Sequence, residues 1–297
     1  MPRPGLLLLA LCGCSVERYA VTRVGDALAR SGGSFASDDD PDLVRDAAPF
    51  SLKLLETLLE AEPDHAGLRL AAARGFTQYA WAFVQRDAEI AEETSVARAA
   101  ELRERARRLY RRAREHGLRG LEVGCAGFEA ELLRDRRRAV RRLREEDVPL
   151  AYWTAAAWGA GIGLSMDDPE TVADLPIVEA LIDRALALDE GFGEGALHTF
   201  LVQYEPNRPG ASKDAAERSR EHFARALQLS RGRLAAPYVA LAEAVALPAQ
   251  DRESYESLLR EALAVDPDAS PDNRLENLVV QRRARWLLDR AADRFLE

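Results

Sequence analysis

Residues 180–189 read ALIDRALALD, and three other segments of the chain have a similar pattern. They are FARALQLS at 223–230, LLREALAVDP at 258–267 and LLETLLEAEP at 54–63. Each places a large apolar residue first, then Ala or Leu three or four positions later, and then the end of a helix. Apolar residues at this spacing lie on one face of an α-helix. The four segments therefore predict helices that bury the same kind of face.

Helix signals continue along the rest of the chain, and no run alternates with the period of two expected of a strand. Glycines at 117–127 and the GAGIG segment at 159–163 predict breaks between helices. The class predicted is all-α. The expected helices are Val16–Arg30, Leu43–Glu60, Leu68–Glu92, Thr94–His116, Phe128–Arg144, Leu150–Gly159, Thr171–Asp189, Gly195–Gln203, Lys213–Ser230, Ala235–Ala246, Arg252–Val265 and Arg274–Phe295.

The recurring segments resemble the second helix of a tetratricopeptide repeat, in which a small residue lets two helices pack closely. Their spacing is looser than the ideal repeat, and the consensus of the first helix is absent. The resemblance implies an array of helical hairpins with divergent tetratricopeptide-like repeats. We expect one helical domain over residues 14–297, preceded by a signal peptide over residues 1–13.

The signal peptide prediction depends on Cys14. Arg3 precedes a short apolar run at 6–11, and Leu11-Cys12-Gly13 stands directly before Cys14. This order resembles the maturation site of a bacterial lipoprotein, and the apolar run is far too short to span a bilayer. Cys14 is thus the predicted lipidation site, and Ser15 after it favours sorting to the outer membrane. The alternative is a misassigned start codon with a chance leucine run.

Composition limits the classes of partner. The net charge is −9, which argues against a nucleic-acid-binding protein. Residues 98–144 depart from this balance, with sixteen arginines and seven acidic residues. Such a stretch could contact phosphates or anionic lipids. A solvated helix face with ion pairs such as Glu101/Arg105 and Glu104/Arg108 is the favoured interpretation.

The sequence offers no constellation for catalysis. The histidines, His65, His116, His198 and His222, stand in no metal-ligand spacing, and no nucleotide-binding loop or nucleophile motif occurs. Cys125 is interpreted as a small buried side chain. We expect no enzyme activity, no metal and no cofactor.

Two aromatic clusters remain as candidates for a binding site. One is FTQYAWAF at 76–83 and the other is YWTAAAWG at 152–159. Packing between helices is the ordinary role of such clusters. The functional alternative is an apolar pocket or pore with a few polar groups. Its candidate lining residues are Gln78, Tyr79, Trp81, Tyr152, Trp153 and Trp158.

Longer blocks of the chain resemble the T-component of TRAP (tripartite ATP-independent periplasmic) transporters, TatT. They are GFTQYAWAFVQ at 75–85, YWTAAAWGAGI at 152–162, and the segments 167–200, 236–252 and 273–290. The resemblance implies a periplasmic lipoprotein of cryptic tetratricopeptide-like hairpins. It further implies homotrimers around a central pore, which partner a periplasmic solute-binding protein in ion-driven uptake. Only Cys14 is carried over, as the membrane anchor.

We therefore expect an accessory transport protein that docks a solute-binding protein and assists ligand uptake. The alternative function is a membrane-tethered helical-repeat scaffold for cell-envelope assembly factors. An uncharacterised hydrolase ranks last, because no nucleophile or metal constellation is found.

Overall fold

The computed structural model describes residues 32–208 and 214–295, and all of its regular secondary structure within these ranges is helical. Cys14, the signal segment and the expected helix Val16–Arg30 lie outside the described residues. The helices are α2 (Gly32–Ala36), α3 (Pro41–Ala61), α4 (Ala66–Tyr79), α5 (Arg86–Glu92), α6 (Val96–Gly124), α7 (Phe128–Arg134), α8 (Arg136–Val140), α9 (Val148–Gly163), α10 (Pro169–Val172), α11 (Leu175–Leu188), α12 (Ala196–Tyr204), α13 (Ala215–Ser230), α14 (Ala236–Leu241), α15 (Arg252–Ala264) and α16 (Arg274–Asp289). Two π-helical turns, η1 (Ala80–Gln85) and η5 (Ala242–Ala246), continue α4 and α14.

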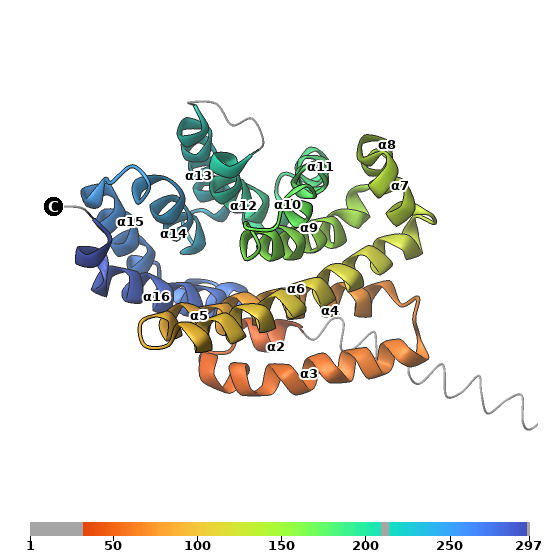
Figure 1. Cartoon of the computed structure of the whole chain (residues 1–297), viewed down its shortest axis with the longest axis horizontal. Coiled ribbons are helices and arrows are strands. Elements are labelled where there is room, and N and C mark those ends of the chain that lie inside the picture. The colour runs from red at the N-terminus through yellow and green to blue at the C-terminus, as the bar shows by residue number, and fades with distance from the viewer. Residues whose placement is uncertain (1–31, 209–213, 296–297) are drawn as a thin grey trace, which may run out of the picture.

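Consecutive helices pack against one another along the chain. The contacts run from α3 to α4, α6, α9 and α11, and then from α12 through α13 and α14 to α15 and α16. Figure 1 shows the resulting two layers, with α3, α4 and α6 in one and α9 to α14 in the other. None of the described helices is both long and apolar enough to cross a bilayer. The all-α prediction is confirmed, whereas the tetratricopeptide-like repeat stays a prediction.

The small residue of the recurring segments is fully buried wherever it is alanine. Ala185 in α11, Ala226 in α13 and Ala262 in α15 are each 0% exposed. A β-carbon built on Gly195 would lie 3.1 Å from the Cα atom of Ala226, so the backbone of the preceding helix approaches closely there. Alanine at this position lets neighbouring helices pack with little space between them.

The break predicted at 117–127 is confirmed only over residues 125–127, between α6 and α7, and the break predicted at 159–163 is wrong. Gly117 and Gly120 lie inside α6, because both glycines permit close contact with α9. A β-carbon on Gly117 would lie 2.1 Å from Thr154 Oγ1, and one on Gly120 would lie 2.6 Å from a methyl carbon of Leu150. The GAGIG segment likewise completes α9 instead of forming a loop. These glycines serve helix packing, and the chain turns only after Gly124.

Helix starts follow the acid-then-proline pattern of the sequence. Asp40 Oδ1 accepts hydrogen bonds from the backbone N–H groups of Asp42 and Leu43 at 3.0 Å, and Pro41 is the first residue of α3. Asp168 caps α10 in the same way, ahead of Pro169. The carboxylate satisfies backbone donors that have no partner inside the helix, and proline needs none in the first turn.

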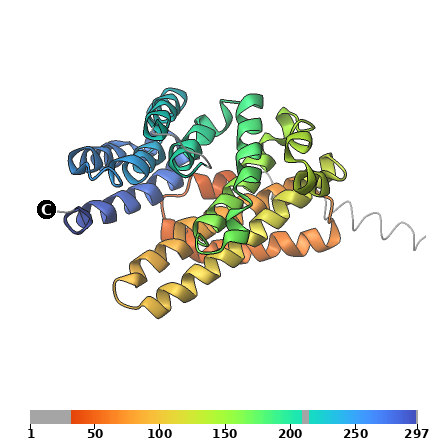
Figure 2. The same cartoon turned by 45° about the horizontal axis from the view of Figure 1, so that its top comes forward.

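The C-terminal helix returns to the beginning of the described chain. Arg282 of α16 forms two hydrogen bonds with Asp42 of α3, at 2.8 and 3.1 Å. Arg274 of the same helix donates to the backbone oxygen of Ser37 at 3.2 Å. Figure 2 shows α16 running up to the N-terminal helices. The helical array therefore closes on itself.

Candidate functional site

An aromatic cluster joins α9 to the segment between α11 and α12. The rings of Tyr152 and Trp153 are 5.0 Å apart, and the ring of Phe192 lies 5.2 Å from that of Tyr152. Tyr152 and Trp153 are half-buried and not fully enclosed. Rings in such contact leave apolar edges available to a ligand or to a further helix.

Glu276, on the first turn of α16, lies near this cluster. Its charge contributes to the raised pKa of the Tyr152 hydroxyl, after the larger effect of burial. Solvent reaches Glu276, yet desolvation raises the pKa of its own carboxyl, with Glu194 adding a like charge. Tyr152 of α9 and Glu276 of α16 thus lie near enough for the charge of one to act on the other.

The α4–η1 segment brings an aromatic ring and a cation to the space between the two layers. Trp81 in η1 is half-buried and packs both on the core of α3, α4 and α6 and on the core of α14 to α16. Leu70 of α4 packs on the core around α9. Arg74 lies between these two residues on the same helical face by its spacing. Desolvation lowers its pKa, and it forms no hydrogen bond or ion pair with another described residue.

We call the set Arg74, Trp81, Tyr152, Trp153 and Glu276 the inner-face residues. They come from α4, η1, α9 and α16, and they are half-buried or accessible. Three of them, Trp81, Tyr152 and Trp153, belong to the predicted lining set. Arg74 and Glu276 were missed, because isolated charged residues in helices carry no motif; only their position on an otherwise apolar face could have indicated them.

The other predicted lining residues lie elsewhere. Gln78 is exposed. Tyr79 is buried and packs in the core of α3, α4 and α6, where its hydroxyl accepts a hydrogen bond from Arg105 at 3.4 Å. Trp158 is 5% exposed and belongs to the core around α9. Its indole N–H donates to Asp174 at 3.1 Å.

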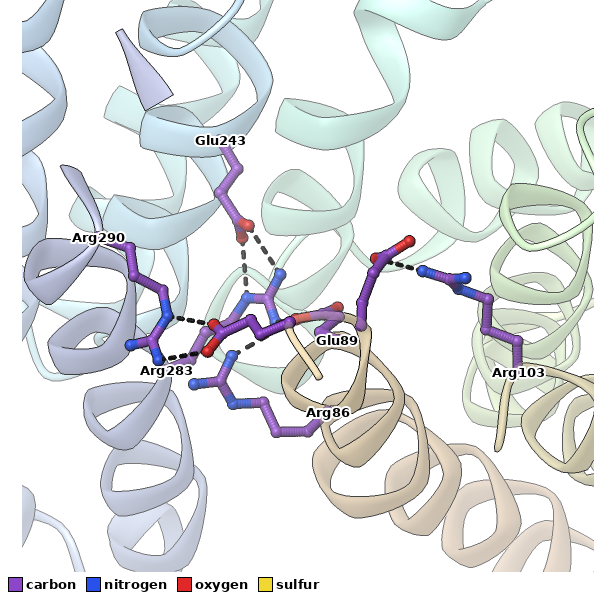
Figure 3. A network of polar contacts seen from close by, with 8 residues as sticks. Arg86, Glu89, Arg103, Glu243, Arg283 and Arg290 are labelled. Carbon is purple, nitrogen blue, oxygen red and sulfur yellow. Dashed lines mark hydrogen bonds and ion pairs between the residues drawn. The ribbon is translucent and has the colours of Figure 1, made fainter. Parts of the chain in front are cut away.

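A set of ion pairs joins α5, η5 and α16, as Figure 3 shows. Arg283 of α16 donates to both carboxylate oxygens of Glu243, at 3.0 and 2.7 Å, and to Glu89 at 2.6 Å. These two carboxylates raise the pKa of Arg283 despite its burial. Arg290, about two helical turns after Arg283 on α16, pairs with Glu93. We call Glu89, Glu93, Glu243, Arg283 and Arg290 the clasp.

Trp286 lies within the clasp and is covered by guanidinium groups. Arg86, Arg290 and Arg294 lie 4.0, 4.8 and 5.1 Å from its ring centre. Around them is an open pocket of about 910 Å³, in which acidic residues outnumber basic ones. Because most of these charges are already paired, the pocket is better suited to holding helices together than to binding a free ion. Its lining residues are Glu89, Glu92, Glu93, Glu243, Arg283, Trp286, Asp289, Arg290, Asp293 and Arg294.

Both π-helical turns lie next to the clasp. η1 ends one residue before Arg86, and η5 contains Glu243. A π-helical turn adds a residue to a helical turn and redirects the side chains that follow it, and such turns are frequent at functional sites. Neither turn is predicted from the sequence, since the residue patterns of both segments are those of ordinary helices.

The histidines form a polar pair and no metal site. His198 Nδ1 lies 2.9 Å from His222 Nδ1, and His198 Nε2 lies 3.2 Å from Glu190. Within residues 32–208 and 214–295, no group of three histidine, cysteine or acidic side chains is arranged to hold a metal ion. Burial lowers the pKa of both histidines, which keeps them neutral at pH 7.

Comparison with known proteins identifies the family of this chain. The family described as TRAP transporter T-component matches residues 37–295, which include every helix named above except α2. The chain belongs to the TRAP transporter T-component family. A protein of Treponema pallidum (strain Nichols), described only as uncharacterized, is 29% identical over 307 residues, which span 97% of this chain and 95% of that protein.

Membership of the T-component family implies a role in a TRAP transport system. The family is an accessory component of transport and not an enzyme family. Both the inner-face residues and the clasp lie within the matched range. The expected resemblance to this family is thereby confirmed.

Proposed function

We propose that this T-component is a periplasmic lipoprotein, anchored through Cys14, that docks a solute-binding protein and assists ligand uptake. The observation that carries the proposal is the pair of contacting rings Tyr152 and Trp153 on α9, both of them partly accessible, with the charge of Glu276 acting on Tyr152. A soluble protein ordinarily buries or disperses such rings, and an accessible cluster with a few polar groups is typical of a ligand site.

The charges of the inner face favour a ligand with both apolar and acidic character. Arg74 is a half-buried cation with no protein partner among the described residues. A ligand carboxylate would compensate its desolvation, since an arginine fork binds a carboxylate through two parallel hydrogen bonds. Trp81, on the same helical face as Arg74 by its spacing, would contact the apolar part of the same molecule. An organic acid with a hydrophobic body fits both features.

Affinity capture tests the docking role. The mature chain with Cys14→Ser, tagged at its C-terminus, is mixed with periplasmic extract of the same cells, and bound proteins are identified. We expect a solute-binding protein at a near-equal molar ratio, and the purified pair should associate again in analytical ultracentrifugation. Recovery of cell-envelope assembly factors without a solute-binding protein would instead support a tethered scaffold.

The same ultracentrifugation measures the assembly of the protein alone. A homotrimer is proposed from the family resemblance, and it predicts a sedimenting mass three times that of the mature chain. A monomer at all concentrations would contradict the trimer without affecting the docking role.

Lipidation is tested separately in the intact cell. Metabolic labelling with an alkyne fatty acid should modify the wild-type protein and leave Cys14→Ser unlabelled. Separation of inner and outer membranes then places the anchor, for which Ser15 favours the outer membrane.

A further inference from the structure

A second pocket has none of the inner-face residues in its lining. It has a volume of about 270 Å³ and is formed by α3, the start of α4 and the second half of α6. Its lining residues are Lys53, Glu56, Leu59, Glu60, Arg69, Arg112, His116 and Arg119. Four arginine and lysine side chains therefore face two carboxylates in a small space.

Arg69 is the buried cation of this pocket. It is 5% exposed, and its hydrogen bonds go to the backbone oxygen of Pro63 at 2.9 Å and to His116 Nδ1 at 3.0 Å. No carboxylate pairs with it among the described residues, although a buried arginine ordinarily has such a partner. Desolvation lowers its pKa, the nearby charge of Arg119 lowers it further, and the more distant charge of Asp64, which forms no ion pair with it, opposes this shift.

Glu56 does not compensate Arg69, because other cations already surround this carboxylate. It accepts a hydrogen bond from Lys53 at 2.8 Å, and Arg112 donates to it through two nitrogen atoms, one of them 2.5 Å from Oε1. His116 Nε2 lies 3.4 Å from the same carboxylate. These hydrogen bonds hold the pKa of Glu56 low although burial raises it. Glu56 is thus fully engaged and orients the groups of the pocket.

An aromatic ring holds the groups around Glu56 in place. The ring of Phe76 stacks on that of His116, with centres 5.8 Å apart and planes 7° apart. The guanidinium of Arg112 lies 4.9 Å from the centre of the same ring. Phe76 is buried and contacts both side chains, so it limits the positions that His116 and Arg112 can take. The pocket is a preorganised arrangement and not a chance gathering of surface arginines.

Arg119 is a further cation in the lining of this pocket. It is exposed, makes no hydrogen bond or ion pair with another described residue, and lies close enough to Arg69 and His116 for its charge to act on both. Two like charges held together without a counter-ion between them raise the local positive potential. We propose that this pocket binds a phosphate group, with Arg69 and Arg119 as its principal cations.

A phosphate group suits the pocket better than a single carboxylate does. Its tetrahedral oxygens can accept from several donors that approach from different helices, as the side chains of α3, α4 and α6 do here. The dianion of free phosphate would compensate both Arg69 and Arg119, and the single charge of a phospholipid phosphodiester would be shared between them. The phosphate could be free inorganic phosphate or the headgroup of an anionic phospholipid, and the experiment separates these two sources.

Calorimetric titration of the mature Cys14→Ser chain with sodium phosphate, against sodium chloride of equal ionic strength, tests the pocket. The matched variants are Arg119→Gln and Arg111→Gln, which remove two exposed arginines of α6, only the first of which lines the pocket. We expect Arg119→Gln to weaken phosphate binding about tenfold, as loss of one charged hydrogen bond does, and Arg111→Gln to leave it unchanged. Circular dichroism confirms that both variants are folded.

Flotation with vesicles identifies the source of the phosphate. Phosphatidylcholine vesicles are compared with vesicles that also contain phosphatidylglycerol, again with both variants. Binding to the anionic vesicles that only Arg119→Gln abolishes assigns the pocket to a lipid headgroup. Binding of free phosphate without such a vesicle preference assigns it to the free anion. Equal weakening by both variants, or no binding of either probe by the wild-type chain, would overturn the proposal.

Discussion

Arg283 and Glu89 lie 194 residues apart in the chain and form a hydrogen bond of 2.6 Å. The same guanidinium binds Glu243, so one side chain links the α5, η5 and α16 segments. Its side chain is only 16% exposed, and those of Glu89 and Glu243 are 24% and 21% exposed. The clasp is therefore a partly buried ion-pair network between distant parts of the sequence.

Replacing Arg283 with methionine should destabilise the fold strongly. The variant leaves Glu243 without a cation and Glu89 with Arg86 alone. Removing one partner of a buried pair costs about 3 kcal/mol or more in unfolding free energy. Urea denaturation followed by circular dichroism measures the loss. Arg290→Gln is the matched control, because its pair with Glu93 is at the surface and should contribute far less. Equal effects of the two variants would contradict this ranking.

The tryptophans should separate into core and inner-face positions. Trp158→Ala removes a ring that is 5% exposed and should cost about 3–5 kcal/mol of stability. Trp153→Ala removes a half-buried ring and should cost less, while lowering binding of an apolar organic acid. Gln78→Ala, at an exposed position, should stay within about 0.5 kcal/mol of the wild type. Denaturation and ligand titration on the same samples distinguish the two effects.

The contact of Gly117 with Thr154 should not tolerate a methyl group. Gly117→Ala places a β-carbon 2.1 Å from Thr154 Oγ1, which must push α6 and α9 apart. We expect a loss of about 1–3 kcal/mol, as for overpacked cores. Gly163→Ala is the control, since no atom lies within 4 Å of its built β-carbon. If Gly117→Ala were as stable as Gly163→Ala, the close helix contact would be refuted.

Acidification should destabilise the protein through His198 and His222. Desolvation holds both pKa values below the ordinary 6.5, so the folded state binds fewer protons than the unfolded state. This contribution is present above pH 6.5 and is lost as the pH falls below it. Arg225 holds the pKa of Glu190 at about 2, so that carboxylate does not titrate in this range.

Melting temperatures between pH 8 and pH 5 test this sign. The wild type should lose stability as the pH falls through about 6.5, and His222→Gln should reduce that slope because it removes one titrating ring. His65→Gln serves as the control, since His65 lies at the start of α4, away from the histidine pair. A melting temperature that rises on acidification would contradict the assignment.

The sequence predicted the helices well and the close contacts poorly. α3 and α15 begin and end within two residues of the expected ranges, because Asp-Pro caps and apolar periodicity are local signals. Gly117 was misassigned, because local propensity treats glycine as a helix breaker, whereas here its lack of a side chain permits a contact with Thr154. The π-helical turns were missed for the same reason: only tertiary packing distinguishes them.

The candidate site was predicted in part. Aromatic density drew attention to Trp81, Tyr152 and Trp153, but it could not separate them from Tyr79 and Trp158, which pack in the core. Burial of a ring depends on which helices surround it, and that follows from the global arrangement. The single charges Arg69, Arg74 and Glu276 acquire meaning only through neighbours from other helices.

The return of α16 to α2 and α3 changes how this array should unfold. In an open solenoid each repeat touches only its neighbours, so the end repeats fray first and stability depends on their number. Here α16 contacts both α2 and α3, the first two helices of the described residues, and Asp42–Arg282 is one of these contacts. We expect the described helices to melt as one cooperative unit, and insertion of an additional hairpin to open the ring instead of lengthening it.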